Sequence, residues 1–482
     1  MKKILMGARL ACATLVALLA VGCGGEVENY QTTGTGEVQW RFASFDLKHT
    51  RKGTAEGNYF QMQTDEKLQP VYGFGAAITG STCYNLLKMS EEDRERILHE
   101  CFSPDEMGMN FIRISIGASD FSLDEYTCCD REGIEFFELH EYDRRDLLPI
   151  LKRILEINPA IRIVGSPWSC PKWMKIGDYD DKPFDSWTAG RLNPRYYDDY
   201  AEYFVRWVGE MEAEGIPIYA ITVQNEPLNR GNSMSLYMGW EQQRDFIRDH
   251  LGPEFERNGI ETKIWAFDHN YNYDNIADQQ GYPLHILADK EAAKYIDGSA
   301  WHNYGGRVTE LDRIHEAYPD KEIFFTEASI GTWNYDFNKC LLTDFSSIFI
   351  GTLKRYGRGV TLWNLILDDE GAPNRPGGCR TCFGAIEISS ESYSYDSLDR
   401  KSHYYNIAHC SKVIKADAWR VASTESLPEG VEMVGFVNPD SSLAVVAANH
   451  TNEVQQVVVQ GAKREFTLTL QPRAIASARW TE

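Results

Sequence analysis

The chain has 482 residues, of which 43% are hydrophobic and 12% aromatic, enough for one large domain and a smaller one. Its formal net charge is −22, whereas nucleic acids and anionic membrane surfaces require a basic face on their partner. The composition therefore argues against both of these partner classes and leaves a neutral substrate open.

The first 22 residues resemble an export signal. Lys2 and Lys3 precede an apolar stretch, residues 10–21, that is too short to span a bilayer. The following run Leu19-Ala-Val-Gly-Cys23 is similar to a bacterial lipoprotein cleavage site, with Cys23 as the acylated residue. We therefore expect an exported protein that is lipid-anchored at the bacterial cell envelope and contacts a membrane only through this anchor. Ordinary secretion is the alternative.

The cysteines give no sign of a metal site. Removing Cys12 with the signal and assigning Cys23 to lipid leaves nine of the eleven, so one thiol at least stays free in a monomer, the state that we expect. Cys379 and Cys382 form a CxxC motif, but no second such motif or histidine lies nearby in the sequence. This pattern favours a small loop disulfide or two free thiols over zinc, and we expect neither a metal nor a cofactor.

Residues 23–36 are polar and rich in glycine and threonine, which predicts a flexible tether. Short alternating patterns over residues 37–71 predict strands without helices between them. From residue 72 to 403, strands and helices alternate. Eight candidate strands centre on Phe74, Ile112, Ile163, Ile221, Ile264, Ala300, Phe325 and Leu362.

Helix signals separate these strands. Ser90 has the character of an N-cap with Asp93 three residues later, and Asn193-Pro194 opens another helix with a cap and an N1 proline. Eight βα units over about 300 residues are typical of an α/β fold of the (β/α)8 barrel type. A doubly wound sheet is the alternative, but no glycine-rich phosphate loop follows the first strand.

After Tyr404 the pattern is all-β to the end of the chain, with strands divided by turn clusters such as Asn438-Pro-Asp440. Both ends of the chain are therefore rich in strands. We expect residues 37–71 and 404–482 to build one side β-sandwich together.

Two predicted barrel strands end near glutamates that lie 101 positions apart. Glu226 follows the fourth strand, and Glu327 ends the seventh. Cleavage of a glycosidic bond with retention needs two carboxyls about 5–5.5 Å apart, one to protonate the leaving oxygen and one to attack the anomeric carbon. We expect the carboxylate of Glu327 to raise the pKa of Glu226, and Asn225 to donate to a sugar 2-hydroxyl.

Other strand ends add polar and aromatic groups to the same face of the barrel. Arg113 is a charge in an apolar strand and must be paired, for which a catalytic carboxylate is a natural partner. Each aromatic residue taken singly can equally be part of the core. The candidates at the ends of other strands are Asp120, Phe121, Trp168, His302, Tyr304, Trp363 and Asn364.

Seven motifs, in this order, resemble glycoside hydrolase family 30, which includes lysosomal acid β-glucosidase and microbial endo-β-1,6-glucanases. They are Gly73-Phe-Gly-Ala-Ala-Ile-Thr, Arg113, Ser119-Asp-Phe-Ser, Ser166-Pro-Trp-Ser-Cys-Pro-Lys-Trp-Met-Lys, Gln224-Asn-Glu-Pro, Phe325-Thr-Glu-Ala-Ser and Leu362-Trp-Asn-Leu. The resemblance implies a retaining, cofactor-free mechanism with Glu226 as acid/base and Glu327 as nucleophile. It also implies a glucose subsite at Asp120, Trp168, Asn225, Trp363 and Asn374.

The sequence leaves the substrate open between a β-glucan and a glucosylated lipid. His302-Asn-Tyr304 differs from the His-Trp-Tyr of the lysosomal enzyme, which puts the aglycone side in question. Polar loops and the tyrosines Tyr271, Tyr273 and Tyr304 suit stacking on further sugars, although loop tyrosines are as often structural. We favour an endo-β-1,6-glucanase. The alternatives are a glucosylceramidase or other β-glucosidase and, more remotely, an inactive carbohydrate-binding lipoprotein.

Overall fold

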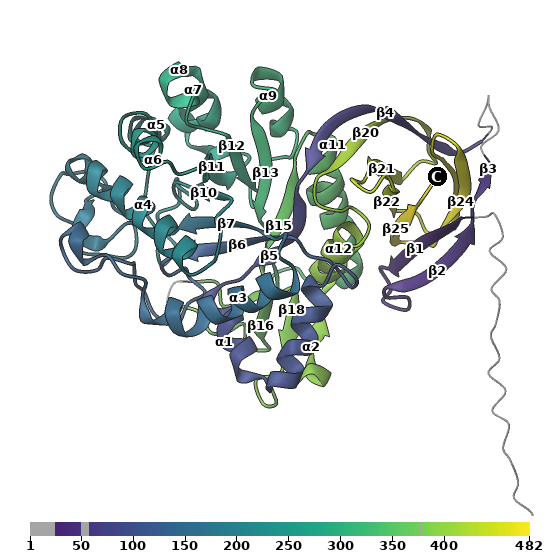
Figure 1. Cartoon of the computed structure of the whole chain (residues 1–482), viewed down its shortest axis with the longest axis horizontal. Helices are drawn as coiled ribbons and strands as arrows, with labels where there is room; N and C mark the ends of the chain where they lie inside the picture. Colours follow the sequence, from purple (N-terminus) through teal and green to yellow (C-terminus); the bar gives the residue numbers. More distant parts are fainter. Residues whose placement is uncertain (1–24, 50–56, 376–377) are drawn as a thin grey trace, which may run out of the picture.

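The computed structural model describes residues 25–49, 57–375 and 378–482. The proposed signal and Cys23 lie outside these ranges. Figure 1 shows a barrel surrounded by helices and, beside it, a body of strands that combines the two ends of the chain. Among the described residues, no helix has the length and apolar character needed to cross a membrane.

Eight parallel strands close into a barrel, as predicted, and each includes one of the eight expected centres. In chain order they are β5 (Gly73–Ala77), β6 (Phe111–Ile116), β7 (Arg162–Pro167), β10 (Ala220–Thr222), β11 (Lys263–Asn270), β12 (Gly298–His302), β13 (Glu322–Glu327) and β15 (Gly359–Asn364). The (β/α)8 prediction is therefore confirmed.

Helices cover the outside of the barrel, and the predicted caps start two of the helical segments. The Ser90 side chain accepts from the backbone N–H of Asp93, and the Asn193 side chain accepts from that of Arg195. The helices are α1 (Gly80–Lys88), α2 (Glu91–Phe102), α3 (Leu148–Ile157), α4 (Tyr197–Ala213), α5 (Trp240–Phe246), α6 (Gly252–Asn258), α7 (Tyr282–Ala288), α8 (Lys290–Ala293), α9 (Glu310–Ala317), α10 (Phe337–Asp344), α11 (Gly351–Lys354) and α12 (Ser402–Ser411).

The loops at the carboxyl ends of the barrel strands contain further short strands. They are β8 (Lys175–Ile176), β9 (Arg191–Leu192), β14 (Ile330–Gly331), β16 (Ile366–Asp368), β17 (Cys382–Phe383), β18 (Ile386–Ile388) and β19 (Asp399–Arg400). Strand β14 pairs with β17. This pairing matters most for the site, because β14 begins three residues after Glu327.

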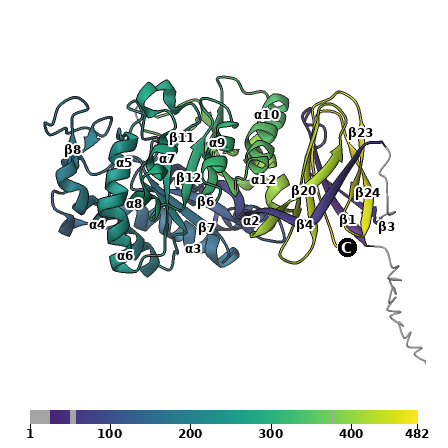
Figure 2. The ribbon, with the colours of Figure 1, turned by 90° about the horizontal axis from the view of Figure 1, so that it is seen from above.

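The second body is a ten-stranded antiparallel-rich sheet that contains strands from both ends of the chain, in the order β2-β1-β25-β22-β21-β20-β4-β23-β24-β3. Figure 2 shows it beside the barrel. The strands are β1 (Glu26–Thr33), β2 (Arg41–Asp46), β3 (Lys48–His49), β4 (Tyr59–Val71), β20 (Ala418–Ser426), β21 (Val431–Val437), β22 (Leu443–Asn449), β23 (Gln455–Gln460), β24 (Arg464–Leu470) and β25 (Ala474–Trp480). The shared side sandwich is thus confirmed.

Two expected boundaries differ from the structure. Residues 26–33, expected in the tether, form β1, because their polar side chains find partners inside the fold: Asn29 donates to the Ser477 carbonyl, and Thr32 lies 2.9 Å from His409. The boundary expected at 403/404 falls inside α12, which is buried along its whole length and packs against both β5 and β25.

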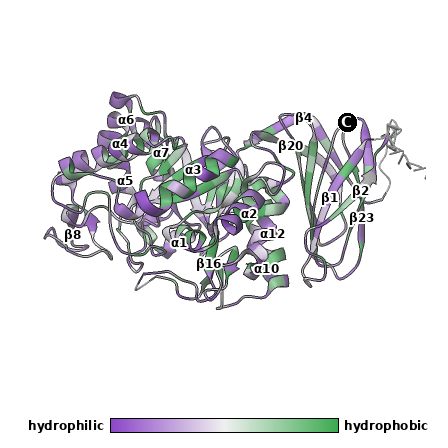
Figure 3. Cartoon of the chain, turned by 60° about the horizontal axis from the view of Figure 1, so that its bottom comes forward, coloured by the Kyte–Doolittle hydropathy of each residue, from purple (hydrophilic) through white to green (hydrophobic). Residues whose placement is uncertain are grey.

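Hydrophobic and hydrophilic residues both occur along the sandwich strands (Figure 3). Buried and more exposed positions alternate in β24, as expected for a strand with one face in a core, whereas β22 is buried along its whole length. The inner face of the sandwich holds its own apolar cluster, which includes Phe60, Met433 and Trp480. The far larger cluster lies between the barrel strands and the surrounding helices and continues onto the other face of the sandwich, where it includes Phe436 and Ile475.

Candidate active site

The side chains that point into the barrel form two successive layers. The lower layer is apolar, and in it the Phe324 ring lies 4.2 Å from that of Phe111 and 5.0 Å from that of Trp265. This cluster, which also contains Val164, Ala220 and Ala300, is fully buried. It forms a closed floor, so any chemistry must take place above it.

The upper layer is polar. Because residues i and i+2 of a strand point the same way, each polar residue comes two positions after a residue of the floor. On this rule five strands place Arg113, Ser166, Thr222, His302 and Thr326 in the barrel interior, and all five side chains are buried. Such a layer is costly to bury unless its members satisfy one another.

Asp268 is the hub of this layer. It comes three positions after Trp265 because β11 contains an irregularity, with φ of 76° at both Phe267 and Asp268. Its carboxylate accepts hydrogen bonds from Thr326 (2.6 Å) and Thr222 (2.7 Å), among other donors. Burial raises the pKa of Asp268, but Arg113, His302 and Thr326 outweigh burial and hold it well below its usual range.

Arg113 connects the hub to the predicted catalytic groups. Its fully buried guanidinium donates to Glu327 (2.6 Å), Asn225 (2.7 Å) and Asp268 (2.8 Å). It also lies over the Trp168 ring, 4.9 Å from the centroid. The predicted pairing of Arg113 with a carboxylate is confirmed.

The two predicted glutamates face each other across the barrel mouth. One carboxylate oxygen of Glu226 and one of Glu327 lie within 4.8 Å of each other and of a ring nitrogen of His302. Tyr304 donates to Glu327 Oε1 at 3.0 Å. Glu226 has φ of 44°, in the left-handed region, where non-glycine residues are strained and often functional.

Amides and imidazoles surround the carboxylate of Glu226. Asn229 and Asn232 donate to its Oε2 at 2.7 and 3.2 Å, and His302 Nδ1 lies 3.2 Å from its Oε1. The other ring nitrogen of His302 lies 3.0 Å from Asp268. An imidazole thus bridges the candidate acid/base and the buried hub.

The protonation of this pair differs from the prediction. Burial raises the pKa of Glu226, but His269 and His302 outweigh burial and lower it to about 2. Burial lowers the pKa of His302, but Glu327, Asp268 and Glu226 together raise it to about 9. At neutral pH the proton of the pair therefore resides on His302, because the imidazolium is stabilised by three carboxylates at once. For Glu327, burial outweighs His302 and Arg113, and its pKa is raised.

A cavity of about 420 Å³ opens above the glutamates. Of the predicted residues, Asp120, Glu226, Tyr304, Glu327 and Trp363 line it. His269, Asn270 and Asp274 also line it and belong to the polar loop around Tyr271 and Tyr273 that was expected at the rim, whereas sequence reasoning missed Asn229, Asn232, Ser329 and Trp333. Trp333 is 55% exposed, and its place six residues after Glu327 in a strand-end loop was the signal available for it.

Four other predicted residues lie behind the lining. Trp168 stacks on Trp363 with ring centroids 5.2 Å apart, and Phe121 meets Trp363 edge-on at 6.0 Å. Both are buried, so they support the wall of the cavity. Asn225 and His302 are also buried and act on the glutamates through the contacts described above.

The structure does not bring Asn364 or Asn374 into the cavity. Asn364 accepts from Thr79 at 2.6 Å, on the side of β15 that faces α1, and Asn374 donates to the Gly371 carbonyl. Nor do Tyr271 and Tyr273 form a rim, since both are buried against Trp301. Alternation along the strand turns Asn364 away from the face used by Trp363, and the aromatic core takes up the two tyrosines.

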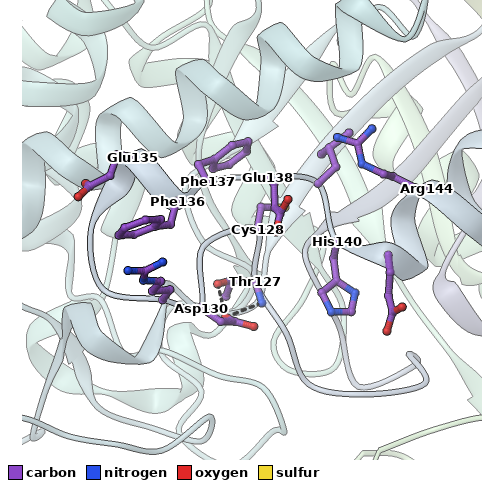
Figure 4. Close-up of a pocket in the computed structure, with 12 residues that line it drawn as sticks. Thr127, Cys128, Asp130, Glu135, Phe136, Phe137, Glu138, His140 and Arg144 are labelled. Atoms are coloured by element: carbon purple, nitrogen blue, oxygen red, sulfur yellow. Dashed lines mark hydrogen bonds between the residues drawn. The ribbon is translucent and has the colours of Figure 1, made fainter.

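A second, larger cavity of about 690 Å³ lies in the segment between β6 and α3 (Figure 4). In it Thr127 donates to Asp130 at 2.6 Å, and Arg131 lies over the Phe136 ring at 3.5 Å. The cluster of two carboxylates and an imidazole formed by Glu226, Glu327 and His302 lies at the smaller cavity. The smaller cavity over the barrel is therefore the candidate active site.

Comparison with known families agrees with this geometry. Residues 71–414 match the model of the glycosyl hydrolase family 30 TIM-barrel domain, and residues 417–478 match that of the family 30 beta sandwich domain. The chain belongs to glycosyl hydrolase family 30. It is therefore an O-glycosyl hydrolase, as the resemblance in its motifs implied.

Individual relatives act on two kinds of substrate. The solved structure of the endo-beta1,6-glucanase BT3312 is 48% identical, with a TM-score of 0.91 over 95% of this chain and 99% of that one. An endo-1,6-beta-D-glucanase of Trichoderma harzianum is 31% identical over 79% of this chain and 78% of its own length. The lysosomal acid glucosylceramidase of Mus musculus is 27% identical over 93% of this chain and 87% of its own.

Proposed function

We propose that this family 30 member is a retaining endo-β-1,6-glucanase. The observation that carries the retaining mechanism is the approach of Glu226 and Glu327 to within 4.8 Å. Retaining glycosidases hold their two carboxyls about 5–5.5 Å apart, whereas inverting enzymes separate theirs by about 6.5–9.5 Å to admit a water molecule. The observed gap has no room for that water.

In this mechanism Glu327 attacks the anomeric carbon and forms a glycosyl ester while the bond to the leaving oxygen breaks. Arg113 and Tyr304 donate to Glu327, which orients its carboxylate and stabilises its ionised form. Glu226 protonates the leaving oxygen. In the second step Glu226 takes a proton from water. The water oxygen attacks the anomeric carbon and breaks its ester bond to Glu327, which releases the sugar.

His302 supplies the proton that Glu226 lacks at rest. Its Nδ1 lies 3.2 Å from Glu226 Oε1, within hydrogen-bond reach, and its pKa of about 9 keeps it charged at neutral pH. His302 passes its proton to Glu226 as Glu226 protonates the leaving oxygen, so Glu226 is ionised and His302 is neutral when the second step begins. The proton that Glu226 then takes from water returns to His302, and Asp268 on the other ring nitrogen holds the imidazole in place. Glu226 can thus act as an acid despite its own low pKa.

The lining of the cavity supports a polymeric sugar as substrate. A lipid substrate needs an apolar rim for its chains, whereas a glucan needs polar and aromatic contacts beyond the first sugar. The rim combines the exposed aromatic rings of Tyr304 and Trp333 with amides and hydroxyls. The structure and the Trichoderma enzyme that are similar to this chain are both named as β-1,6-glucanases.

The test is a product assay of the purified enzyme on linear β-1,6-glucan, other β-glucans and detergent-dispersed glucosylceramide at equal enzyme concentration. We expect β-1,6-linked oligosaccharides from the polymer and little glucose from the lipid. The mouse relative makes glucosylceramide the second candidate. Efficient release of glucose from the lipid, with the polymer intact, would replace the glucanase by a glucosylceramidase with the same mechanism.

We also propose that the enzyme is exported and lipid-anchored through Cys23, which suits the harvesting of polysaccharide at the cell envelope. The support is the basic start, the short apolar stretch and the Leu19–Cys23 run. Labelling of cells with a fatty-acid analogue should mark the wild-type protein and not a Cys23→Ala variant. Secretion of an unlabelled wild-type protein would contradict the anchor.

A further inference from the structure

The CxxC motif forms a disulfide, Cys379–Cys382, at the edge of the active-site cavity. Both cysteines line the cavity, and Cys382 packs into the apolar cluster that holds Trp168 and Trp363. The seven other cysteines whose side chains are described are free. A single crosslink at the substrate cavity, in a fold that leaves those seven thiols unpaired, calls for a local explanation.

On one side the disulfide loop fixes Asp120. Burial, Glu327 and Glu226 together raise the pKa of Asp120 to about 8, and the nearby backbone of Cys379 counteracts part of this rise. Gly378 packs so closely that a Cβ there would lie 3.0 Å from the Cβ of Asp120. Arg375 donates its N–H to the Asp120 carbonyl at 2.7 Å. Asp120 is thus held from the loop through its backbone and its side chain.

On the other side the loop supports Trp333. Strand β17, which contains Cys382, pairs with β14, where Gly331 is the partner of Cys382. A Cβ on Gly331 would lie 1.9 Å from the Trp333 ring and 2.2 Å from the Thr381 carbonyl oxygen. The indole therefore packs directly against Gly331, beside the loop that the disulfide closes.

We propose that the Cys379–Cys382 disulfide is a positioning element for sugar binding, which holds Asp120 on one wall of the cavity and Trp333 on the other. The proposal deepens the proposed glucanase function and rests on the same site. Neither sulfur takes part in the chemistry. The disulfide fixes the backbone that packs against Asp120 at the adjoining Gly378 and that pairs with β14 next to Trp333.

The test compares the oxidised enzyme with enzyme reduced in its folded state by a phosphine. Loss of the contacts that hold Asp120 predicts a rise in KM for β-1,6-glucan of about tenfold, with kcat changed far less. Thiol titration shows that the bond has been opened, and reoxidation should restore the KM. The Cys379→Ser/Cys382→Ser variant should start with the high KM and not respond to the reductant. That control excludes effects on the other thiols.

Asp120 and Trp333 can be separated with variants. Reduction should change the KM of Asp120→Ala less than that of the wild type, because the side chain that the disulfide positions has already been removed. In Trp333→Ala, the rise in KM caused by reduction should become smaller for the polymer, and less so for an aryl β-glucoside. An unchanged KM after complete reduction, with only the melting temperature lowered, would show that the disulfide merely stabilises the fold.

The aryl β-glucoside also separates the two proposals. If the enzyme cleaves it but leaves β-1,6-glucan intact, the proposed substrate is wrong. The KM of the aryl glucoside in the oxidised and reduced enzyme then still decides whether the disulfide positions Asp120.

Discussion

Strand β13 begins with Glu322 and ends with Glu327, and both carboxylates are buried at opposite ends of the barrel. Glu322 accepts hydrogen bonds from Trp265 (3.0 Å), Tyr72 (3.1 Å) and Arg358 (3.1 Å) and forms an ion pair with Lys263. Glu327 likewise accepts from an arginine and a tyrosine. Burial and good hydrogen bonds are therefore common to both ends and do not identify the active one.

The balance of charge separates the two ends. Around Glu322, one acid meets two cations. At the other end there are three buried carboxylates, those of Glu226, Asp268 and Glu327, and Arg113 pairs with the last two. The excess of negative charge holds a proton on His302. The end with unpaired negative charge also opens into a cavity. The Glu327 end therefore has a transferable proton on His302 next to a cavity for substrate, and the ion pairs of Glu322 have neither.

The largest expected effect comes from Glu327→Ala. Removal of the nucleophile should lower kcat by about 10⁴-fold or more, which is the scale seen when a member of the catalytic triad of subtilisin is removed. The folded state should persist, because the substitution also relieves the crowding of negative charge near Glu226. Steady-state kinetics with β-1,6-glucan, together with a thermal melt, measure both. Full turnover in this variant would rule out Glu327 as the nucleophile.

Glu226→Ala should have a smaller effect that depends on the leaving group. Loss of a general acid costs about 10²–10⁴-fold for the glucan, but aryl glucosides with good leaving groups need no protonation and should keep their rate of glycosyl-enzyme formation. Added azide should then give a β-azide product, because it attacks the ester on Glu327 from the vacated face. An α-azide product would reverse the two roles.

Glu322→Ala tests the other end of the same strand. It leaves Lys263 and Arg358 without their carboxylate, and removing one partner of a buried pair costs about 3–5 kcal/mol. We expect this loss in the free energy of unfolding, measured with urea, while kcat/KM of the folded enzyme stays near the wild-type value. A large loss of kcat/KM with unchanged stability would mean that the two ends of β13 do not differ as proposed.

Most of the fold could be predicted from the sequence because the barrel strands are apolar runs separated by capped helices. Each of the eight expected centres lies in a barrel strand, and the strand-end rule brought Glu226 and Glu327 together. The tether prediction failed for β1, where polarity suggested solvent. Buried hydrogen bonds to distant residues such as Ser477 make that segment a strand, and such partners are not visible in local sequence.

The site was less predictable, for two physical reasons. Asp268 reaches the barrel interior only through an irregularity in β11. Simple alternation from Trp265 would instead place Phe267 in the interior. The pKa of Glu226 was predicted from its neighbour Glu327 alone, whereas two histidines outweigh that neighbour. A shift in pKa depends on all nearby charges, and His269 and His302 come from other strands than either glutamate.

The last and smallest effect concerns the proton held by His302. Its pKa is about 9 in the folded protein and about 6.5 in the unfolded chain, so the folded state binds more protons between these values. The resulting stabilisation is complete below pH 6.5 and is lost as pH rises through 9. The free energy of unfolding should fall by at most about 3 kcal/mol over this window, since each pKa unit is worth about 1.4 kcal/mol.

His302→Gln should flatten this dependence, and His285→Gln, at an exposed histidine on α7, should retain it. Urea unfolding at several pH values between 6.5 and 9 measures the slope. Asp120, with a raised pKa of about 8, adds a decline of its own that both variants share, so the difference between the variants isolates His302. Parallel curves would mean that His302 is neutral in the resting enzyme. The charge imbalance that distinguishes this end of β13 from the Glu322 end would then have to be carried by a proton on one of the two catalytic glutamates.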